Sequence, residues 1–116
     1  MIGNGDFMNI NINNICGKKT VTRDDGEKVN KILNEKWNCE KIIQIDFSNV
    51  LVASVSFMDE AFGKLALKHT KEDLQEKLRF KNIVKYDKAL LNDILYSRFR
   101  QRELCENGIH INLNQK

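Results

Sequence analysis

The chain has 116 residues, of which 41% are hydrophobic and 30% charged, and its formal net charge is +3. A chain of this length forms one domain and buries about 65% of its unfolded surface, so its core needs no disulfide or metal. No apolar run approaches the ~20 residues that cross a bilayer, and the start of the chain lacks a signal peptide's basic and apolar segments. The mild charge does not by itself indicate nucleic-acid or membrane binding. We therefore expect a cytoplasmic protein, and the absence of proline with abundant Asn, Lys and Ile suggests an AT-rich bacterial genome.

The start of the chain predicts an edge strand. Residues 1–6 read as a flexible leader, and residues 7–15 alternate between apolar and asparagine side chains. Such alternation is typical of a strand with one buried and one wet face, which occurs near the edge of a sheet. Gly17 marks a turn, after which residues 18–21 can return beside the first strand as a hairpin. That pairing would make the sheet mixed.

The first helix is predicted over residues 24–37. Thr22 and Asp25 have the spacing of a capping box, in which each side chain bonds the backbone N–H of the other residue. Apolar residues then follow at helical spacing: Val29, Ile32, Leu33 and Trp37. Gly26 weakens the start of this helix by up to ~1 kcal/mol relative to alanine.

The central stretch predicts a buried strand followed by a helix. Residues 42–47 form a near-continuous apolar run, which is typical of a strand covered on both faces. From Phe57 onward, apolar residues recur every three or four positions, as on one face of a helix. Ser56 and Asp59 form a second apparent capping box, so Ser56 is the expected N-cap. Gly63 within the helix predicts a close approach of helix and sheet, because glycine has no Cβ to keep them apart.

The remainder of the chain predicts one more strand and a long helix. Residues 70–74 begin a short helical turn, residues 77–81 alternate apolar side chains with cations, and residues 82–84 close this strand. Cations along an edge strand oppose pairing with another chain. Asp87 is the expected cap of a helix that runs through Leu104, and residues 105–116 are either a final edge strand or a tail.

These elements predict an α/β domain over residues 7–104. Strands and helices alternate along the chain, and each crossover carries a helix across a face of the sheet. We expect a small mixed sheet of about four strands, with helices packed mainly on one face.

The central stretch also resembles a known family. Residues 45–50, IDFSNV, and residues 53–60, ASVSFMDE, resemble the signature of the STAS-like domains of unknown function. That family is distantly related to the STAS domain, which is named for sulphate transporters and anti-sigma-factor antagonists. The likeness covers about residues 8–104 and is most specific over residues 56–60. It implies a small α/β module that binds proteins and has no chemistry of its own. Its partner in bacterial partner switching or stress signalling would be an ATPase of the histidine-kinase type.

Ser54 and Ser56 are candidate phosphoacceptors by the same resemblance, because STAS antagonists are regulated by phosphorylation at a helix start. This sequence departs from the antagonist pattern, since no Asp precedes Ser54 and no Gly follows Ser56. A gap-free alignment even places Val55 at the phosphorylated position. Asp59 and Glu60 would also repel a phosphate, so a simple N-cap role for Ser56 is favoured over phosphorylation.

Asp59, Glu60 and Asp46 are the other candidate site residues. Adjacent helix positions point about 100° apart, so Asp59 and Glu60 do not converge on one substrate atom as an acid and base pair would. They are better suited to complement the helix dipole or to contact a basic partner. Asp46 ends the central strand, where ligands bind in open α/β sheets, although it can equally cap the following turn.

A small nucleic-acid-associated regulator is the alternative function. It would use the basic residues of 77–88 together with Arg98, Arg100 and Arg102 at the end of the long helix. Cations at a helix C-terminus are expected without any nucleic acid, because they complement the dipole. An enzyme is not expected, since the sequence shows neither a nucleophile with its base nor a close pair of metal ligands. We therefore expect no catalytic residues, cofactor or metal site.

Overall fold

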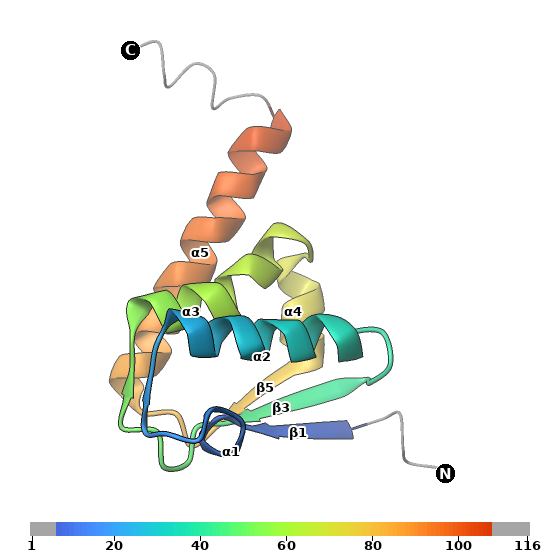
Figure 1. Ribbon diagram of the computed structural model, residues 1–116. Coiled ribbons are helices and arrows are strands. Elements are labelled where there is room, and N and C mark those ends of the chain that lie inside the picture. Colours follow the sequence, from blue (N-terminus) through green and yellow to red (C-terminus); the bar gives the residue numbers. More distant parts are fainter. Residues whose placement is uncertain (1–6, 108–116) are drawn as a thin grey trace.

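The computed structural model describes residues 7–107, and the expected leader at 1–6 lies outside the described residues. Its main sheet has three strands in the order β1, β3, β5, which are Phe7–Asn11, Ile42–Asp46 and Leu78–Lys81 (Figure 1). Both pairings are parallel. The predicted edge position of the first strand is confirmed, and the alternating basic strand occupies the opposite edge. Its expected extent over residues 7–15 is wrong, because Asn11 caps the helix Ile12–Cys16 by accepting the Asn14 N–H.

A second, two-stranded ladder joins β2, Thr20–Val21, to β4, Val52–Ala53, and it too is parallel. The hairpin expected between residues 18–21 and the first strand is therefore wrong, and so is the mixed sheet of about four strands. The reason is a long-range contact: Lys19 O accepts the backbone N–H groups of Leu51 and Val52, at 2.8 and 3.1 Å. This contact draws the segment after α1 toward the turn that follows β3.

The register of the main sheet explains its apolar face. Met8, Ile43 and Leu78 lie side by side across the three strands, and Ile10, Ile45 and Phe80 form the next row. Ile43 and Ile45 are fully buried, whereas Ile42, Gln44 and Asp46 on the opposite face are half-buried. The expectation that β3 is covered on both faces is therefore wrong, because none of the helices within residues 7–107 packs on the second face in Figure 1.

The helices lie mainly on one face of the sheet, as expected (Figure 1). They are α1 (Ile12–Cys16), α2 (Arg23–Lys36), α3 (Val55–Ala61), the 3-10 helix η1 (Gly63–Leu67), α4 (Lys71–Lys77) and α5 (Lys85–Asn107). The long helix α5 continues to Asn107, so residues 105–107 are helical and are neither strand nor tail. The weak alternation beyond Asn107 lies outside the described residues. None of the helices in residues 7–107 has the length and apolar character needed to cross a membrane.

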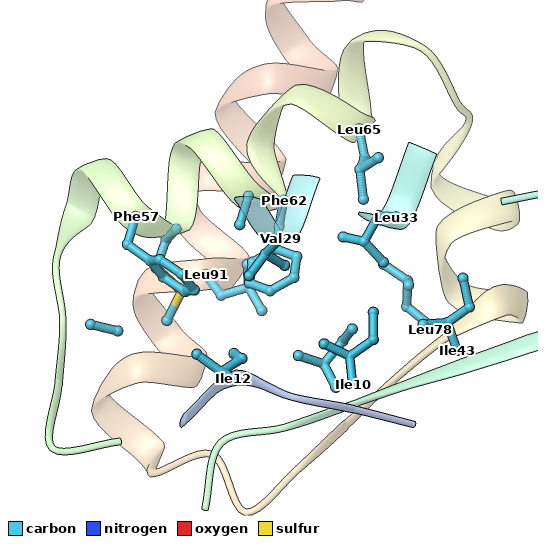
Figure 2. Close-up of a cluster of buried hydrophobic side chains, with 14 of the residues drawn as sticks. Ile10, Ile12, Val29, Leu33, Ile43, Phe57, Phe62, Leu65, Leu78 and Leu91 are labelled. Atoms are coloured by element: carbon cyan, nitrogen blue, oxygen red, sulfur yellow. The ribbon is translucent and has the colours of Figure 1, made fainter. Parts of the chain in front are cut away.

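Apolar side chains from the sheet and the helices meet in one core (Figure 2). The sheet contributes Ile10, Ile43 and Leu78, α2 contributes Val29 and Leu33, and the later helical segments contribute Phe57, Phe62, Leu65 and Leu91. Each fully buried side chain of this size stabilises the fold by about 1.5–3 kcal/mol relative to leaving it exposed. The core thus fixes α3 above the sheet and sets the position of its first turn.

Two glycines allow close packing between helices. A Cβ on Gly26 of α2 would lie 2.7 Å from Phe57 O and 3.2 Å from Ala61 N, so α2 approaches the backbone of α3 directly. A Cβ on Gly63 would meet Asp59 and the Ile94 methyl group of α5, which corrects the expected contact with the sheet. Gly26 therefore has a packing reason that outweighs its poor helix propensity.

The predicted caps divide into correct and wrong assignments. Thr22 N–H donates to Asp25 Oδ2 at 2.9 Å, as the capping-box spacing predicted for α2. Thr70 caps α4 in the same way, with its hydroxyl accepting the Asp73 N–H. Asp87 is wrong as a cap, because α5 begins two residues earlier and Asp87 is buried in its first turn. Burial raises the pKa of this carboxyl.

Candidate functional site

Ser54, and not Ser56, is the N-cap of α3. The Ser54 hydroxyl oxygen accepts the Phe57 N–H at 3.0 Å, and its backbone is extended with φ −69° and ψ 161°. The cap falls here because Ser54 N–H still donates to Val21 O, which holds the end of β4 against β2. The helix can begin only at the next residue, Val55. The predicted capping box between Ser56 and Asp59 is therefore wrong.

Ser54→Ala is expected to lower the free energy of unfolding by about 1 kcal/mol, because it leaves the Phe57 N–H without its acceptor. Ser56→Ala is the matched control and should change stability by less than about 0.5 kcal/mol, since Ser56 caps nothing. Urea melts of both variants at constant m-value measure the difference. Equal losses would contradict the cap assignment.

Asp59 faces α5 and is paired with Arg98. The guanidinium Nε donates to Asp59 Oδ1 at 2.8 Å and Nη2 contacts Oδ2, which is a bidentate ion pair between α3 and α5. Hydrogen bonds from Arg98 lower the pKa of Asp59 below its ordinary value. Arg98 was expected only as part of a basic helix end, and its role here is to join two helices.

Glu60 lies on the other side of α3 and is 5% exposed. Arg23, the first residue of α2, donates to Glu60 Oε1 at 3.2 Å, and Lys64 contacts Oε2. The interpretation of Glu60 as an exposed acid that meets a basic partner is therefore wrong. The spacing of four residues between Glu60 and Lys64 is a signal that the sequence offers for this ion pair.

A groove of about 400 Å³ runs between α2, α3 and α5. Its lining residues come from the three helices: Arg23, Val55, Ser56, Asp59, Asp93, Ile94, Ser97 and Arg98. Arg23 Nη2 approaches the Ser56 hydroxyl at 3.4 Å, so the groove combines a serine with a guanidinium. Of the predicted site residues, the structure brings Ser56 and Asp59 to this groove. Its arginines were not predicted as part of the site.

Residues 51–55, the turn that leads through β4 into the first residue of α3, expose three aliphatic side chains. Leu51 is 72% exposed, Val52 52% and Val55 59%, and Val55 also lines the groove. They belong to residues 47–58, a run of the sequence without a charged side chain. Single exposed apolar residues are common on protein surfaces, but three within five residues beside a groove are typical of a contact surface. Sequence reasoning assigned this run to the strand and turn and missed its exposure.

Comparison with protein families gives a match over residues 25–88 to the model of the STAS-like domain of unknown function. The match includes β3, the turn, α3 and η1, and it spans more than half of the 116 residues. The chain belongs to this family. The resemblance predicted from the central stretch is confirmed. A search of curated proteins found no match, and neither did a search of solved structures.

Asp46 of this STAS-like domain is engaged in its own turn. Its Oδ1 accepts hydrogen bonds from the Ser48 N–H at 2.9 Å, the Ser48 hydroxyl at 2.6 Å and Asn82 Nδ2 at 2.9 Å. The Ser48 hydroxyl and the Asn82 amide lower the pKa of Asp46 to about 2. Asp46 therefore caps the turn that follows β3, which was one of its two predicted roles. Through Asn82 it also joins the end of β3 to the residue after β5.

Much of the expected basic surface of the STAS-like domain is used internally. Lys77 Nζ contacts Glu40 O and lies 5.5 Å from the centre of the Trp37 ring. Arg79 donates to carbonyl groups at the end of α4, the shortest at 2.8 Å to Gln75 O. Arg102 donates to the carbonyl of His69, after η1, and Arg98 forms its ion pair with Asp59 of α3. These contacts weaken the nucleic-acid hypothesis, because each one ties up a cation that the hypothesis assigned to phosphate binding.

Proposed function

We propose that this STAS-like domain is a non-catalytic protein-interaction module that acts in the cytoplasm. Its contact surface is the turn before α3 together with the groove beside it. The observation that carries the proposal is the exposure of Leu51, Val52 and Val55, the last of which lines that groove. Partners bury such aliphatic side chains, and their burial supplies the main favourable free energy of association.

The proposed partner is an ATPase of the histidine-kinase type in a partner-switching system. Membership of the STAS-like family supports this proposal, through the family's distant relation to the anti-sigma-factor antagonists. The position of the surface supports it as well, because residues 56–60, the part most similar to the family signature, include Ser56 and Asp59 of the groove lining.

Ser54 and Ser56 remain the candidate phosphoacceptors, with different consequences. A phosphate on Ser56 would reach the Arg23 guanidinium, which already approaches its hydroxyl, and would compete with Glu60 for that cation. The repulsion expected from Asp59 and Glu60 is reduced, since each carboxylate is paired with a cation. A phosphate on Ser54 would replace the hydroxyl that caps α3. Either change would place negative charge beside the exposed aliphatic side chains and so weaken the contact with a partner that buries them.

Leu51→Asp with Val55→Asp is expected to weaken binding to the ATPase by at least about tenfold, because two exposed apolar contacts become charged. The measurement is titration calorimetry with a histidine-kinase-type ATPase, the class of partner proposed here. Leu67→Asp is the control, since Leu67 is an exposed leucine at the end of η1, outside the turn and the lining of the groove. Circular dichroism checks that all proteins are folded. Unchanged affinity in the double variant would refute this surface, and absence of binding by the wild type would refute the ATPase as partner.

A further inference from the structure

The strand β1 leaves one side of the sheet open. It pairs with β3 on one side, and among residues 7–107 no strand pairs with its other side. The outer backbone N–H and C=O groups of an edge strand are a template for another strand. β1 lies at the front of the molecule in Figure 1, and α1 follows at its end without covering the strand.

The two edges of the sheet differ in charge. The β5 edge carries Arg79 and Lys81, both exposed, and cations of this kind oppose strand addition. The β1 edge lacks such features, because residues 7–17 contain no charged side chain and no proline. Phe7 on this strand is 55% exposed, and Met8 is only half-buried although it belongs to an apolar row of the sheet. An uncharged, partly apolar edge favours the addition of another strand.

We infer that β1 pairs antiparallel with β1 of a second copy of this chain, across a two-fold axis perpendicular to the sheet. In an antiparallel pair, opposite residues point to the same face, so residues of the same parity must meet. Full overlap of Phe7–Asn11 then centres on Asn9, with Asn9 facing its own copy. Met8 falls opposite Ile10 of the second copy, on the face that the helices cover.

This arrangement is self-complementary in its side chains. The row of Leu78, Ile43 and Met8 ends at β1, and Ile10 of the second copy would continue it with another apolar residue. Uncharged Asn9 meets uncharged Asn9, so no like charges oppose each other at the axis. An isologous contact of this kind closes on itself and forms a dimer without continuing into a fibre. Two five-residue strands make a small interface, so the dimer should be weak and dependent on concentration.

Sedimentation velocity of the full chain over ~5–500 µM tests the inference. Wild type is expected to shift with rising concentration from 13.5 kDa toward twice that mass. Asn9→Lys puts two ammonium groups opposite each other at the axis and should raise the dimer dissociation constant by about fivefold or more. Asn92→Lys adds the same charge at an exposed position of α5 and should leave the constant unchanged.

Asn9 Oδ1 also accepts a hydrogen bond from Gln44 at 2.8 Å, and Asn9→Lys removes it. Circular dichroism therefore checks that this variant is still folded. If that variant unfolds, Phe7→Lys replaces it, since Phe7 lies on the same edge and its side chain has no hydrogen-bonding group to lose. A wild-type chain that stays monomeric over the whole range would overturn the inference. So would a folded edge variant that dimerises as strongly as wild type, because another surface would then form the dimer.

Discussion

Replacing Gly26 by alanine is expected to lower the free energy of unfolding by about 3 kcal/mol, at the upper end of ordinary overpacking. Helix propensity alone would predict the opposite sign, a gain of about 0.5–1 kcal/mol. The added Cβ would lie 2.7 Å from Phe57 O and 2.9 Å from Glu60 Cβ, and both belong to the rigid first turns of α3. The backbone cannot rotate away as a flexible side chain can, so α2 and α3 must separate.

Urea melts followed by circular dichroism measure this change, and Lys31→Ala on the exposed face of α2 is the control. A stabilised Gly26→Ala variant would contradict the close packing of α2 on α3. Gly63→Ala should cost less, about 1 kcal/mol, because its new neighbours are the side chains of Asp59 and Ile94.

Phe62→Ala is expected to have the largest effect, a loss of about 3–5 kcal/mol. Phe62 is fully buried at the junction of α3 and η1. Its ring centre lies 5.3 Å from that of Phe80 and 6.0 Å from that of Phe57, both in edge-to-face arrangements. Truncation removes these ring contacts and leaves a cavity between the helices and β5, which the tightly packed core can fill only in part.

Phe7→Ala is the matched control for Phe62→Ala, because Phe7 is 55% exposed and should change stability by less than about 0.5 kcal/mol. Thermal or urea unfolding at low protein concentration keeps self-association out of the comparison. If Phe62→Ala lost no more than Phe7→Ala, the aromatic cluster would not be part of the stable core.

Local patterns predicted most of the elements correctly. The apolar spacing of α2 and the capping box of Thr22 with Asp25 placed that helix to within a residue at each end. The alternation of residues 7–15 predicted the edge position of β1, because alternating apolar and polar side chains show that only one face of the strand is buried. The resemblance over residues 45–60 supplied the family, which periodicity alone could not.

The errors come from contacts between distant parts of the chain. Ser56 and Asp59 have the correct spacing for a capping box, but the pairing of β4 with β2 starts the helix one residue after Ser54. The same pairing replaces the expected hairpin. Glu60 seemed exposed because its partner Arg23 lies 37 residues away in the sequence. The exposure of Leu51 and Val55 likewise depends on which side of the turn the rest of the chain covers. A local sequence pattern cannot predict this exposure.

Hydrogen–deuterium exchange on a complex with a histidine-kinase-type ATPase, the proposed partner, tests the proposed contact surface most directly. Free and bound protein are compared peptide by peptide. We expect the largest slowing of exchange over residues 51–59, where the turn becomes buried, with little change over β5 and the start of α5. Protection confined to residues 78–88, with none over 51–59, would contradict the account and place the contact on the basic edge of the domain.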